Sequence, residues 1–438
     1  MRGTQLRTTL LALALVAGLV ACGDDSSDSA SSDSKSADDS SAPAAEVIAV
    51  PADQPTIQEA VDVAEPGALI LVSPGTYNEE VTVETDDLTI RGLDRNDVII
   101  DGEFARENGI KVFSNGVAVE NLSVRNHTGN GVFFTGDYGK GVTLSGYRAS
   151  YVTAYNNGLY GIYAFSAEDG QIDHSYGSGH PDSAFYVGQC QDCNALLTDN
   201  VAENNMLGYS GTNSTGVTIV NSVWRNNRAG IVPNSLYTEA FGPNSGSTIV
   251  GNLVEDNNSS TAPESASFAV AFGNGIVIGG GSKIIVERNT VSKHKNAGIV
   301  VTDLPTSKDP ADDKEKSFKP EGNQVRENVL SQNTFDLAYL TVNYASQPFG
   351  NCFEKNSFTS SFPEGIEKSM SCGAPVDTDL GDLSGILARI TAGPPAVDYK
   401  TVAAPGPQEN MAKAATAKAA GAKGPASVDL ASITAPKG

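Results

Sequence analysis

Apolar residues between positions 47 and 373 come mostly in runs of three or four, separated by glycine, asparagine, proline or aspartate. Runs of this length are too short for helices and are typical of short β-strands. The first of them are Leu69–Val72, Val81–Val83, Leu88–Ile90 and Val98–Ile100. The pattern predicts an all-β body assembled from many short strands.

One helix is predicted before these strands. Thr56-Ile57-Gln58-Glu59 is a capping box, in which the Thr and Glu side chains satisfy free backbone amides of the first turn. Ile57, Ala60, Val61 and Ala64 then form one apolar stripe at helical spacing. Pro66-Gly67 ends the helix, so we expect it to be short and to cover the first strands.

The body repeats. One apolar element begins at Gly131, Gly161, Ala184, Gly208, Gly230, Gly275 and Gly298. A second element carries asparagine beside a short apolar run, at Asn121, Asn200, Asn221, Asn252, Asn289, Asn328 and Asn356. Three consecutive steps of the first element are 23, 24 and 22 residues. A period this short, made of very short strands, predicts that each coil of chain adds strands to parallel sheets wound around one axis.

The residues also carry a family resemblance. The Thr-Ile-Gln-Glu-Ala-Val helix and the Pro-Gly-Thr-Tyr-Asn-Glu turn resemble the N-terminal cap and first coil of pectate-lyase-like proteins. The Gly-Ile and Asn repeats look like the right-handed β-helix repeat of that group and of NosD-like periplasmic proteins. The resemblance covers residues 46–373 and implies a right-handed parallel β-helix with an N-terminal capping helix. It implies little about function, because lyases, hydrolases, epimerases, adhesins and non-catalytic proteins share this fold.

Both ends of the chain differ from the body. Arg2, Arg7 and the apolar run Leu10–Val20 predict a signal peptide over residues 1–21. Leu19-Val20-Ala21-Cys22 resembles a lipobox, which implies acylation of Cys22 and a lipid anchor on the outer face of a bacterial cell membrane. Residues 22–45 predict an acidic, disordered tether. For residues 374–438 we expect a short capping helix near 379–391 and then a disordered tail.

The remaining cysteines limit the disulfide pairings, and the net charge limits the kinds of binding partner. Cys190, Cys193, Cys352 and Cys372 are an even number in an exported chain, and the local pairs 190–193 and 352–372 are the simplest of three connectivities. The net charge of -23 argues against nucleic acid as a partner, because phosphate binding requires a basic surface. A uronate polymer would bind only through local Arg or Lys residues or a bridging cation.

Aligning the coils on the Gly-Ile element predicts an outward row of side chains. Strand alternation points Ile162 and Phe185 inward, so Tyr163 and Tyr186 point outward. Gln189 and Asn213 align as a polar row beside them. Aromatic rings beside amides suit a sugar, so Tyr163, Gln189 and Asn213 are candidate substrate-binding residues.

The most reactive side chains gather between residues 173 and 193, and three chemistries are open. The first is lyase or epimerase chemistry, with His180 or Tyr186 as base and Arg228, or a Ca²⁺ ion, neutralising a uronate. The second is hydrolysis by paired carboxylates, for which the candidates are Asp173, Asp182, Asp199 and Glu203. The third is a metal site of Cys190, Cys193 and His180. The candidate catalytic set is His180, Asp182, Tyr186 and Arg228.

These observations predict a lipid-anchored surface protein that binds an extracellular polysaccharide. If it is an enzyme, a lyase or epimerase is favoured over a hydrolase. The alternatives are a non-catalytic scaffold or adhesin-like protein and a NosD-like, metal-related exported protein.

Overall fold

The computed structural model describes residues 46–265, 271–344, 347–373, 380, 386, 389–419 and 421–438. The predicted signal peptide (1–21), the predicted lipidation site Cys22 and the tether (22–45) lie outside these residues, as does most of the helix expected near 379–391. Of the helices that are described, none has the length and hydrophobicity needed to span a bilayer.

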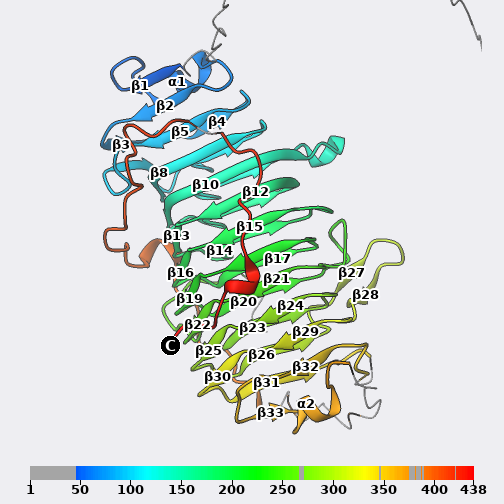
Figure 1. Ribbon diagram of the computed structural model, residues 1–438. Helices are drawn as coiled ribbons and strands as arrows, with labels where there is room; N and C mark the ends of the chain where they lie inside the picture. The colour runs from blue at the N-terminus through cyan, green and yellow to red at the C-terminus, as the bar shows by residue number, and fades with distance from the viewer. Residues whose placement is uncertain are drawn as a thin grey trace, which may run out of the picture. The chain divides into compact units, whose positions relative to one another are not determined.

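The body is a right-handed parallel β-helix, as predicted (Figure 1). One strand from each coil forms an 11-stranded sheet. Its strands are β4 (Val81–Val83), β7 (Ile110–Val112), β9 (Val132–Thr135), β11 (Ile162–Phe165), β14 (Ser183–Gly188), β17 (Leu207–Thr212), β20 (Ala229–Asn234), β23 (Asn274–Gly279), β26 (Ala297–Thr302), β31 (Phe335–Leu340) and β33 (Ser361–Phe362).

The other strands form a 20-stranded sheet that bends into two halves. The first half holds β1 (Val47–Val50), β2 (Leu69–Val72), β5 (Thr89–Gly92), β12 (Ala167–Asp173), β15 (Ala195–Thr198), β18 (Val217–Val220), β21 (Thr248–Val250), β24 (Ile285–Glu287), β29 (Gln324–Arg326) and β32 (Cys352–Glu354). The second half holds β3 (Gly75–Tyr77), β6 (Val98–Asp101), β13 (Tyr176–Ser178), β16 (Val201–Glu203), β19 (Val223–Arg225), β22 (Leu253–Glu255), β25 (Thr290–Ser292) and β30 (Val329–Ser331). Two long strands, β8 (Val117–Arg125) and β10 (Leu144–Tyr155), run through both halves.

The coils stack in the predicted register. Ile162 pairs with Phe185, Phe185 with Tyr209, and Tyr209 with Ile231, all on parallel strands. These four side chains are at most 1% exposed, so they form part of a continuous core along the axis. Burying one such apolar side chain per strand stabilises the fold by about 1.5–3 kcal/mol each.

Ladders of asparagine side chains join the coils at the corners. In one ladder the amide of Asn252 donates to Asn289 Oδ1 (3.0 Å), and the amide of Asn289 donates to Asn328 Oδ1 (3.0 Å). At most of these corners the preceding residue has a positive φ, for example 50° at Asn221 and 51° at Arg288. At the corner, the backbone amide of each ladder residue donates to the side-chain oxygen of the ladder residue one coil later, as Asn252 N does to Asn289 Oδ1 at 2.9 Å, which satisfies buried polar groups.

The two ends of the solenoid are covered. At the first coil, helix α1 (Ile57–Val63) has the predicted capping bond from Glu59 N to Thr56 Oγ1 (3.1 Å). At the last coil, helix α2 (Ile366–Ser369) buries Ile366, and the predicted Cys352–Cys372 disulfide ties this end together. A β-hairpin, β27 (Ser307–Asp309) with β28 (Lys314–Lys316), lies in the charged segment 303–322, which interrupts the repeat.

The C-terminal residues 391–419 and 421–438, here called the strap, do not form the disordered tail that the composition predicted. Short 3₁₀ turns at Tyr399–Thr401 and Leu430–Ser432, and a hydrogen-bonded turn over residues 412–416, interrupt a largely extended path. The strap runs from Asn296, past Asn156, to the N-terminal coils, and then returns to Thr290. Its final part crosses β12 and β15 in Figure 1.

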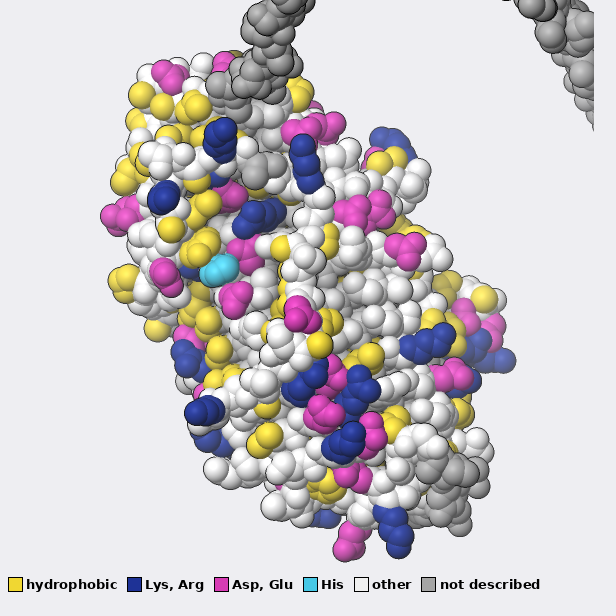
Figure 2. All heavy atoms as spheres, in the orientation of Figure 1, with side chains coloured by type: hydrophobic (Ala, Val, Ile, Leu, Met, Phe, Trp, Pro, Cys, Tyr) yellow, Lys and Arg dark blue, Asp and Glu magenta, His cyan; other side chains and the backbone are white. Residues whose placement is uncertain are grey.

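Backbone carbonyls hold the strap to arginines of the body. Arg91 donates to the carbonyls of Ala414, Ala417 and Lys418, and Arg95 donates to the carbonyl of Glu409. The disorder prediction was wrong because these donors are about 300 residues away in the sequence and cannot be seen in the composition of the strap. On the side with the returning strap, Lys and Arg side chains are interleaved with Asp and Glu (Figure 2).

Candidate functional site

The outward side of the 11-stranded sheet carries one row of side chains along the axis. Phe133 pairs in register with Tyr163, and Tyr163 pairs with Tyr186. Ser210 and Val232 follow on the next two coils. The predicted row is therefore present, and it extends two coils further towards the N-terminus, through Phe133 and Lys111, than the sequence analysis proposed.

An open groove of about 410 Å³ lies over the N-terminal part of this row. We call it the aromatic groove, and its lining residues are Lys111, Phe113, Phe133, Thr135, Gly136, Asp137, Tyr138, Tyr163 and Phe165. The rings of Phe133 and Tyr163 are stacked, with centroids 4.6 Å apart and 19° between their planes. Lys111 Nζ lies 4.9 Å from the Phe113 centroid and 5.4 Å from that of Phe133. The groove thus offers flat apolar surfaces, the cation of Lys111, and the carboxylate of Asp137, which is paired with Lys140 at 2.7 Å.

A cluster of hydroxyl and carboxyl groups lies where the groove ends, one coil further on. Tyr160 stacks on Tyr163 with a centroid distance of 4.3 Å, and Tyr186 meets Tyr163 edge-on at 4.9 Å. Asp182 precedes β14, and Glu239 reaches the same cluster from the loop after β20. We call Tyr160, Tyr186, Asp182 and Glu239 the acid cluster.

The surroundings change the ionisation of the acid cluster. Burial raises the pKa of Asp182 to about 7, although a hydrogen bond with Tyr160 opposes this, and the negative charge of Glu239 adds to it. Burial also raises the pKa of Glu239, against a hydrogen bond from Gln189. Burial is the main cause of the raised pKa values of Tyr160 and Tyr186 as well. Asp182 therefore exchanges a proton near neutral pH, as a general acid or base requires.

This shift predicts a pH-dependent stability. An unfolded aspartate has a pKa of about 4, so folding favours the protonated form, and its contribution is lost as pH rises from about 4 to about 7. We expect Asp182→Asn to raise the free energy of unfolding by about 2 kcal/mol at pH 8, which is about half the full shift because water still reaches this side chain. Chemical denaturation at pH 8 and pH 4 measures the difference. Equal effects of the substitution at both pH values would contradict the raised pKa.

His180, a predicted base, lies elsewhere. It is fully buried in a second ladder that runs along another corner. The Nδ1 atom of His180 is 2.8 Å from Asn205 Oδ1, and its Nε2 atom is 3.3 Å from Asn157 Nδ2. Both ring nitrogens are engaged, and the side chain points into the solenoid, so the prediction of His180 as a catalytic base is wrong. Its ladder position is equivalent to Asn205 one coil later, which explains why it is buried.

Arg228, the predicted neutraliser of a uronate, is already occupied. Its Nη2 atom pairs with Glu264 Oε2 at 2.6 Å and donates to the carbonyl of Pro394 in the strap at 2.8 Å. Its guanidinium lies over the Phe272 ring, 5.2 Å from the centroid, and only 3% of the residue is exposed. The sequence prediction is wrong here because Glu264 from a loop and the carbonyl of Pro394 from the strap already bind this guanidinium group.

Gln189 and Asn213 lie at the corner after β14 and β17, beside the sheet as predicted. Gln189 donates to Glu239 Oε2 at 2.8 Å, while Asn213 is fully buried against the loop 235–243. Only one of the three predicted substrate-binding residues therefore lines the groove. Tyr163 lines the groove, whereas Gln189 and Asn213 bond to a loop.

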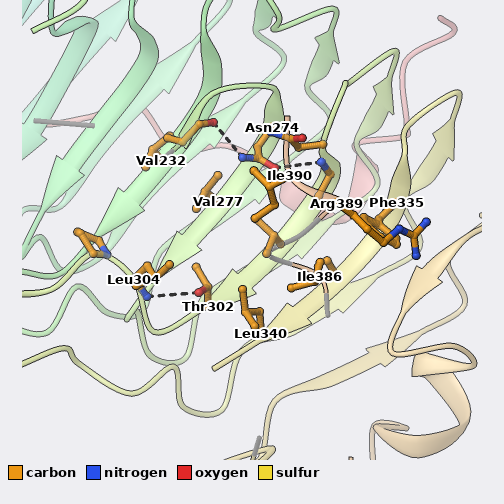
Figure 3. A pocket seen from close by; sticks show the side chains of 16 residues that line it. Val232, Asn274, Val277, Thr302, Leu304, Phe335, Leu340, Ile386, Arg389 and Ile390 are labelled. Atoms are coloured by element: carbon orange, nitrogen blue, oxygen red, sulfur yellow. Dashed lines mark hydrogen bonds between the residues drawn. The ribbon is translucent and has the colours of Figure 1, made fainter. Parts of the chain in front are cut away.

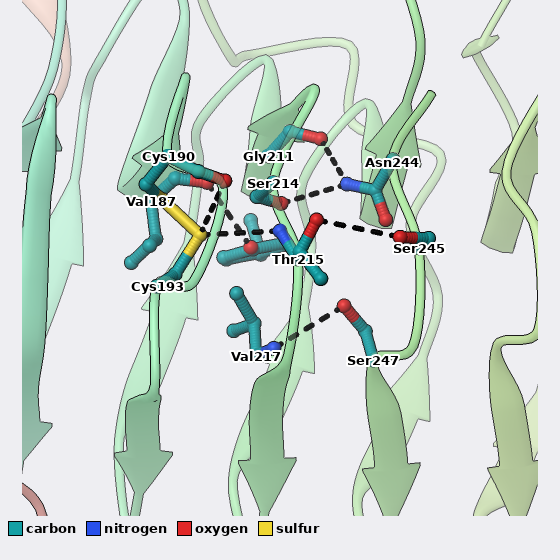
Figure 4. The surroundings of a disulfide bond; sticks show 11 residues. Val187, Cys190, Cys193, Gly211, Ser214, Thr215, Val217, Asn244, Ser245 and Ser247 are labelled. Atoms are coloured by element: carbon teal, nitrogen blue, oxygen red, sulfur yellow. Dashed lines mark hydrogen bonds between the residues drawn. A yellow bond between two sulfur atoms is a disulfide. The ribbon is translucent and has the colours of Figure 1, made fainter. Parts of the chain in front are cut away.

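The predicted Cys190–Cys193 disulfide is confirmed and follows Gln189 directly (Figure 4). Thr215 N on the next coil donates to Cys193 Sγ at 3.1 Å. The alternative of a metal site of Cys190, Cys193 and His180 is therefore wrong, since the two sulfur atoms are bonded to each other. Across the described part of the chain, no group of three or more His, Cys, Asp or Glu side chains is arranged to hold a metal ion. The expectation of Ca²⁺ stays a prediction.

The other carboxylates that were candidates for hydrolysis lie on different sides of the solenoid. Asp173 accepts hydrogen bonds from Gln171 and Ser150 on the 20-stranded sheet. Glu203 pairs with Arg225 at 2.8 Å on the second half of that sheet. Asp182 is thus joined by Glu239, which the sequence analysis did not single out.

A second cavity, of about 70 Å³, lies further along the outward side of the 11-stranded sheet (Figure 3). Val232, Val277, Val300 and Leu340 line it from the sheet, and Ile386 lines it from the C-terminal segment. The guanidinium of Arg389 lies 4.2 Å from the Phe335 centroid. This cavity is small and mainly apolar, so it differs chemically from the aromatic groove.

Sequence reasoning found only Tyr163, Tyr186 and Asp182 among the residues of the groove and cluster, and those it missed include Lys111, Phe133, Phe165, Tyr160 and Glu239. Extending the coil alignment by one or two coils would have found Lys111 and Phe133, because they occupy the same row as Tyr163. Glu239 had no such signal, since it lies in the insertion 235–270 that interrupts the period.

Comparison with known proteins agrees with the fold. The family model described as the right handed beta helix region matches residues 234–379. No curated protein matches the chain. The β-helix is similar to the A-module of the mannuronan C-5 epimerase AlgE4 from Azotobacter vinelandii, with 13% identity, a TM-score of 0.49, and coverage of 70% of this chain and 91% of that one.

Two further solved structures are similar at the same level. One is a mannuronic acid-specific family 6 polysaccharide lyase from human gut microbiota, with 14% identity, a TM-score of 0.45, and coverage of 71% and 86% of this chain and that one. The other is the catalytic unit of a GH87 α-1,3-glucanase from Streptomyces thermodiastaticus, with 11% identity, a TM-score of 0.44, and coverage of 75% and 66%. The paired parallel strands of the chain itself define the molecule as a right-handed parallel β-helix protein.

Proposed function

We propose that this protein is an exported, lipid-anchored surface protein that binds an extracellular polysaccharide in the aromatic groove. The observation that carries the proposal is the stack of Phe133, Tyr163 and Tyr160, which lines and ends a groove on the outward side of the sheet. Sugar rings present apolar C–H faces that pack on aromatic rings, and hydroxyl edges that bond to groups such as those of the acid cluster. The lipobox at Cys22 supports export and anchoring.

Removing either ring of the stack tests the binding proposal. We expect Phe133→Ala and Tyr163→Ala each to weaken glycan binding by about tenfold or more, because each loses a flat contact surface worth about 1.5 kcal/mol. Calorimetry of residues 46–438 against soluble neutral and acidic polysaccharides measures this. Tyr151→Ala is the matched control, since this ring lies against His174 at a corner of the other sheet.

Two outcomes of this screen would contradict the proposal. If the unmodified protein binds none of the polysaccharides, a non-catalytic scaffold replaces the proposal. If Tyr151→Ala weakens binding as much as Tyr163→Ala, the aromatic groove is not the binding site.

Glycan processing is a second candidate function, which the pKa of about 7 at Asp182 favours. A carboxyl group that exchanges its proton near neutral pH beside a sugar-binding surface suits general acid–base catalysis of hydrolysis, elimination or epimerisation. Two carboxyl groups in one cluster favour hydrolysis, because elimination from a uronate requires its carboxylate to be neutralised and the predicted neutraliser, Arg228, is paired with Glu264.

The processing candidate is tested by incubating the protein with each polysaccharide that binds. New reducing ends indicate hydrolysis, and new ultraviolet absorbance from double bonds indicates elimination. In either case Asp182→Asn is expected to abolish the product signal while binding persists. Unchanged product formation in that variant would exclude Asp182 as the proton-transferring group.

A further inference from the structure

The outward row of the 11-stranded sheet is open at one end and covered at the other. Phe133 and Tyr163 are accessible in the aromatic groove. Tyr186, one coil further on, is only 4% exposed, and the next two residues of the row, Ser210 and Val232, are 1% and 2% exposed. These side chains point away from the core, so other parts of the chain must cover them. The groove therefore stops at the acid cluster.

The loop 235–243 lies where the groove stops. Asn213 Nδ2 donates to the carbonyls of Leu236 (2.8 Å) and Glu239 (2.9 Å), and Leu236 N donates back to Asn213 Oδ1 (3.0 Å). Gln189 Nε2 completes the attachment through Glu239 Oε2 at 2.8 Å. Four hydrogen bonds thus fix this loop to two successive coils.

The same loop is braced from its outer side. The ring of Tyr237 stacks on Phe318 with a centroid distance of 4.0 Å, and Tyr237 N donates to Ser307 Oγ at 2.7 Å. Both partners belong to the insertion that contains the β27–β28 hairpin. A polymer lying in the groove would have to displace this loop in order to continue along the sheet. Such a displacement would break the bonds of Asn213, which is fully buried.

The charges differ between the two ends of the row. Lys111 lies at the open end, while Asp182 and Glu239 lie at the closed end. The negative charge of each carboxylate raises the energy of the other, and it would do the same to a uronate placed beside them. Carboxyl groups instead accept hydrogen bonds from sugar hydroxyls. The closed end thus favours a neutral sugar.

We propose that the aromatic groove receives the end of a polysaccharide chain and that the terminal sugar against Asp182 and Glu239 is neutral. This inference rests on the proposed function and adds the part of the polymer that is bound. The internal units of the chain then leave the groove past Phe133 and Lys111.

Binding that depends on chain ends can be measured without knowing the polymer in advance. Each of amylose, laminarin, xylan, galactomannan, alginate and polygalacturonate is titrated intact and after partial hydrolysis to about a tenth of its length. At equal mass, the shortened sample carries about ten times more ends, so an end-binding site should show about tenfold higher apparent affinity by mass. A site that binds internal units should show an unchanged or lower affinity.

The outcomes separate this inference from the proposed function. If none of the six polymers binds, both the proposed function and this inference are contradicted. Binding with equal affinity by mass before and after shortening overturns the inference and leaves the proposed function standing. Stronger end-dependent binding of alginate or polygalacturonate than of the neutral polymers overturns the neutral terminal sugar.

A loop variant supplies a second test. We expect Asn213→Ala combined with Gln189→Ala, which removes all four hydrogen bonds, to loosen the loop and to reduce the tenfold preference for shortened chains towards unity. Tyr151→Ala, on the other sheet, should keep the full preference. Retention of the preference in the loop variant would show that the loop 235–243 does not close the groove.

Discussion

Ending the chain after Val402 is expected to lower the free energy of unfolding by about 4 kcal/mol. The deletion removes the carbonyls of Glu409, Ala414, Ala417 and Lys418, to which Arg91 and Arg95 donate. These arginines are 1% and 3% exposed, and hydrogen bonds to a charged group contribute about 1.5–3 kcal/mol each. Once the strap is removed, water molecules can accept hydrogen bonds from the two arginines, and this offsets part of the lost stabilisation.

Trp224 makes this measurement direct. It is the only tryptophan of the chain and is fully buried, so its fluorescence reports unfolding of the central coils in urea. A control that ends after Ser427 keeps every partner of Arg91 and Arg95 but loses the packing of Val428, Leu430 and Ile433 on Leu196, Val220 and Val250. We expect a smaller loss in the control. Equal midpoints for the full chain and the Val402 truncation would show that the strap does not stabilise the body.

Acidification from pH 6.5 to pH 4 is expected to destabilise the protein through its buried histidines. Burial lowers the pKa of His180 and of His294 to about 4, as it does that of the third buried histidine, His127, against an unfolded value of about 6.5. The folded protein favours the neutral rings, so their contribution is complete above pH 6.5 and is lost as pH falls towards 4. Each shift corresponds to about 3 kcal/mol.

The ladder geometry explains why a proton cannot be accommodated. In each case Nδ1 lies 2.8 Å from an asparagine oxygen, Asn205 Oδ1 for His180 and Asn333 Oδ1 for His294. The Nε2 atom faces an asparagine amide nitrogen, at 3.1 Å from Asn257 Nδ2 in the case of His294. A proton added at Nε2 would face the hydrogen atoms of that amide.

Substitution by the residue that occupies most other positions of this ladder tests the prediction. We expect His180→Asn with His294→Asn to reduce the loss of stability between pH 6.5 and 4, as measured by urea denaturation at each pH, and the remaining loss to come in part from His127. His174→Asn is the control, because the His174 side chain is 43% exposed. A double variant as acid-sensitive as the unmodified protein would show that these histidines do not cause the effect.

The fold could be predicted because each coil pairs with the next. A repeat of about 23 residues places similar residues at equivalent positions, so the period of the sequence is also the spacing of the contacts. The alignment of Ile162, Phe185, Tyr209 and Ile231 follows from this alone. So does the outward row of Tyr163 and Tyr186, which led to the aromatic groove.

The candidate catalytic residues could be predicted only in part. His180 and Arg228 were chosen for their chemical type near other reactive residues, but the first lies in a ladder and the second pairs with Glu264. Whether a polar side chain is free or occupied depends on partners from other coils. The repeat says which coil a residue belongs to, but it does not reveal what an insertion places against it.

The sequence by itself determined the solenoid, its register and its N-terminal cap, and it favoured both disulfides among three connectivities, because all of these arise between residues of one coil or adjacent coils. Only the tertiary structure decided the acid cluster, the closed end of the groove and the strap. Glu239 comes from an insertion without a period, and the strap meets Arg91 more than 320 residues away in the sequence. Such contacts depend on where loops and the strap lie in space, and no local pattern encodes that position.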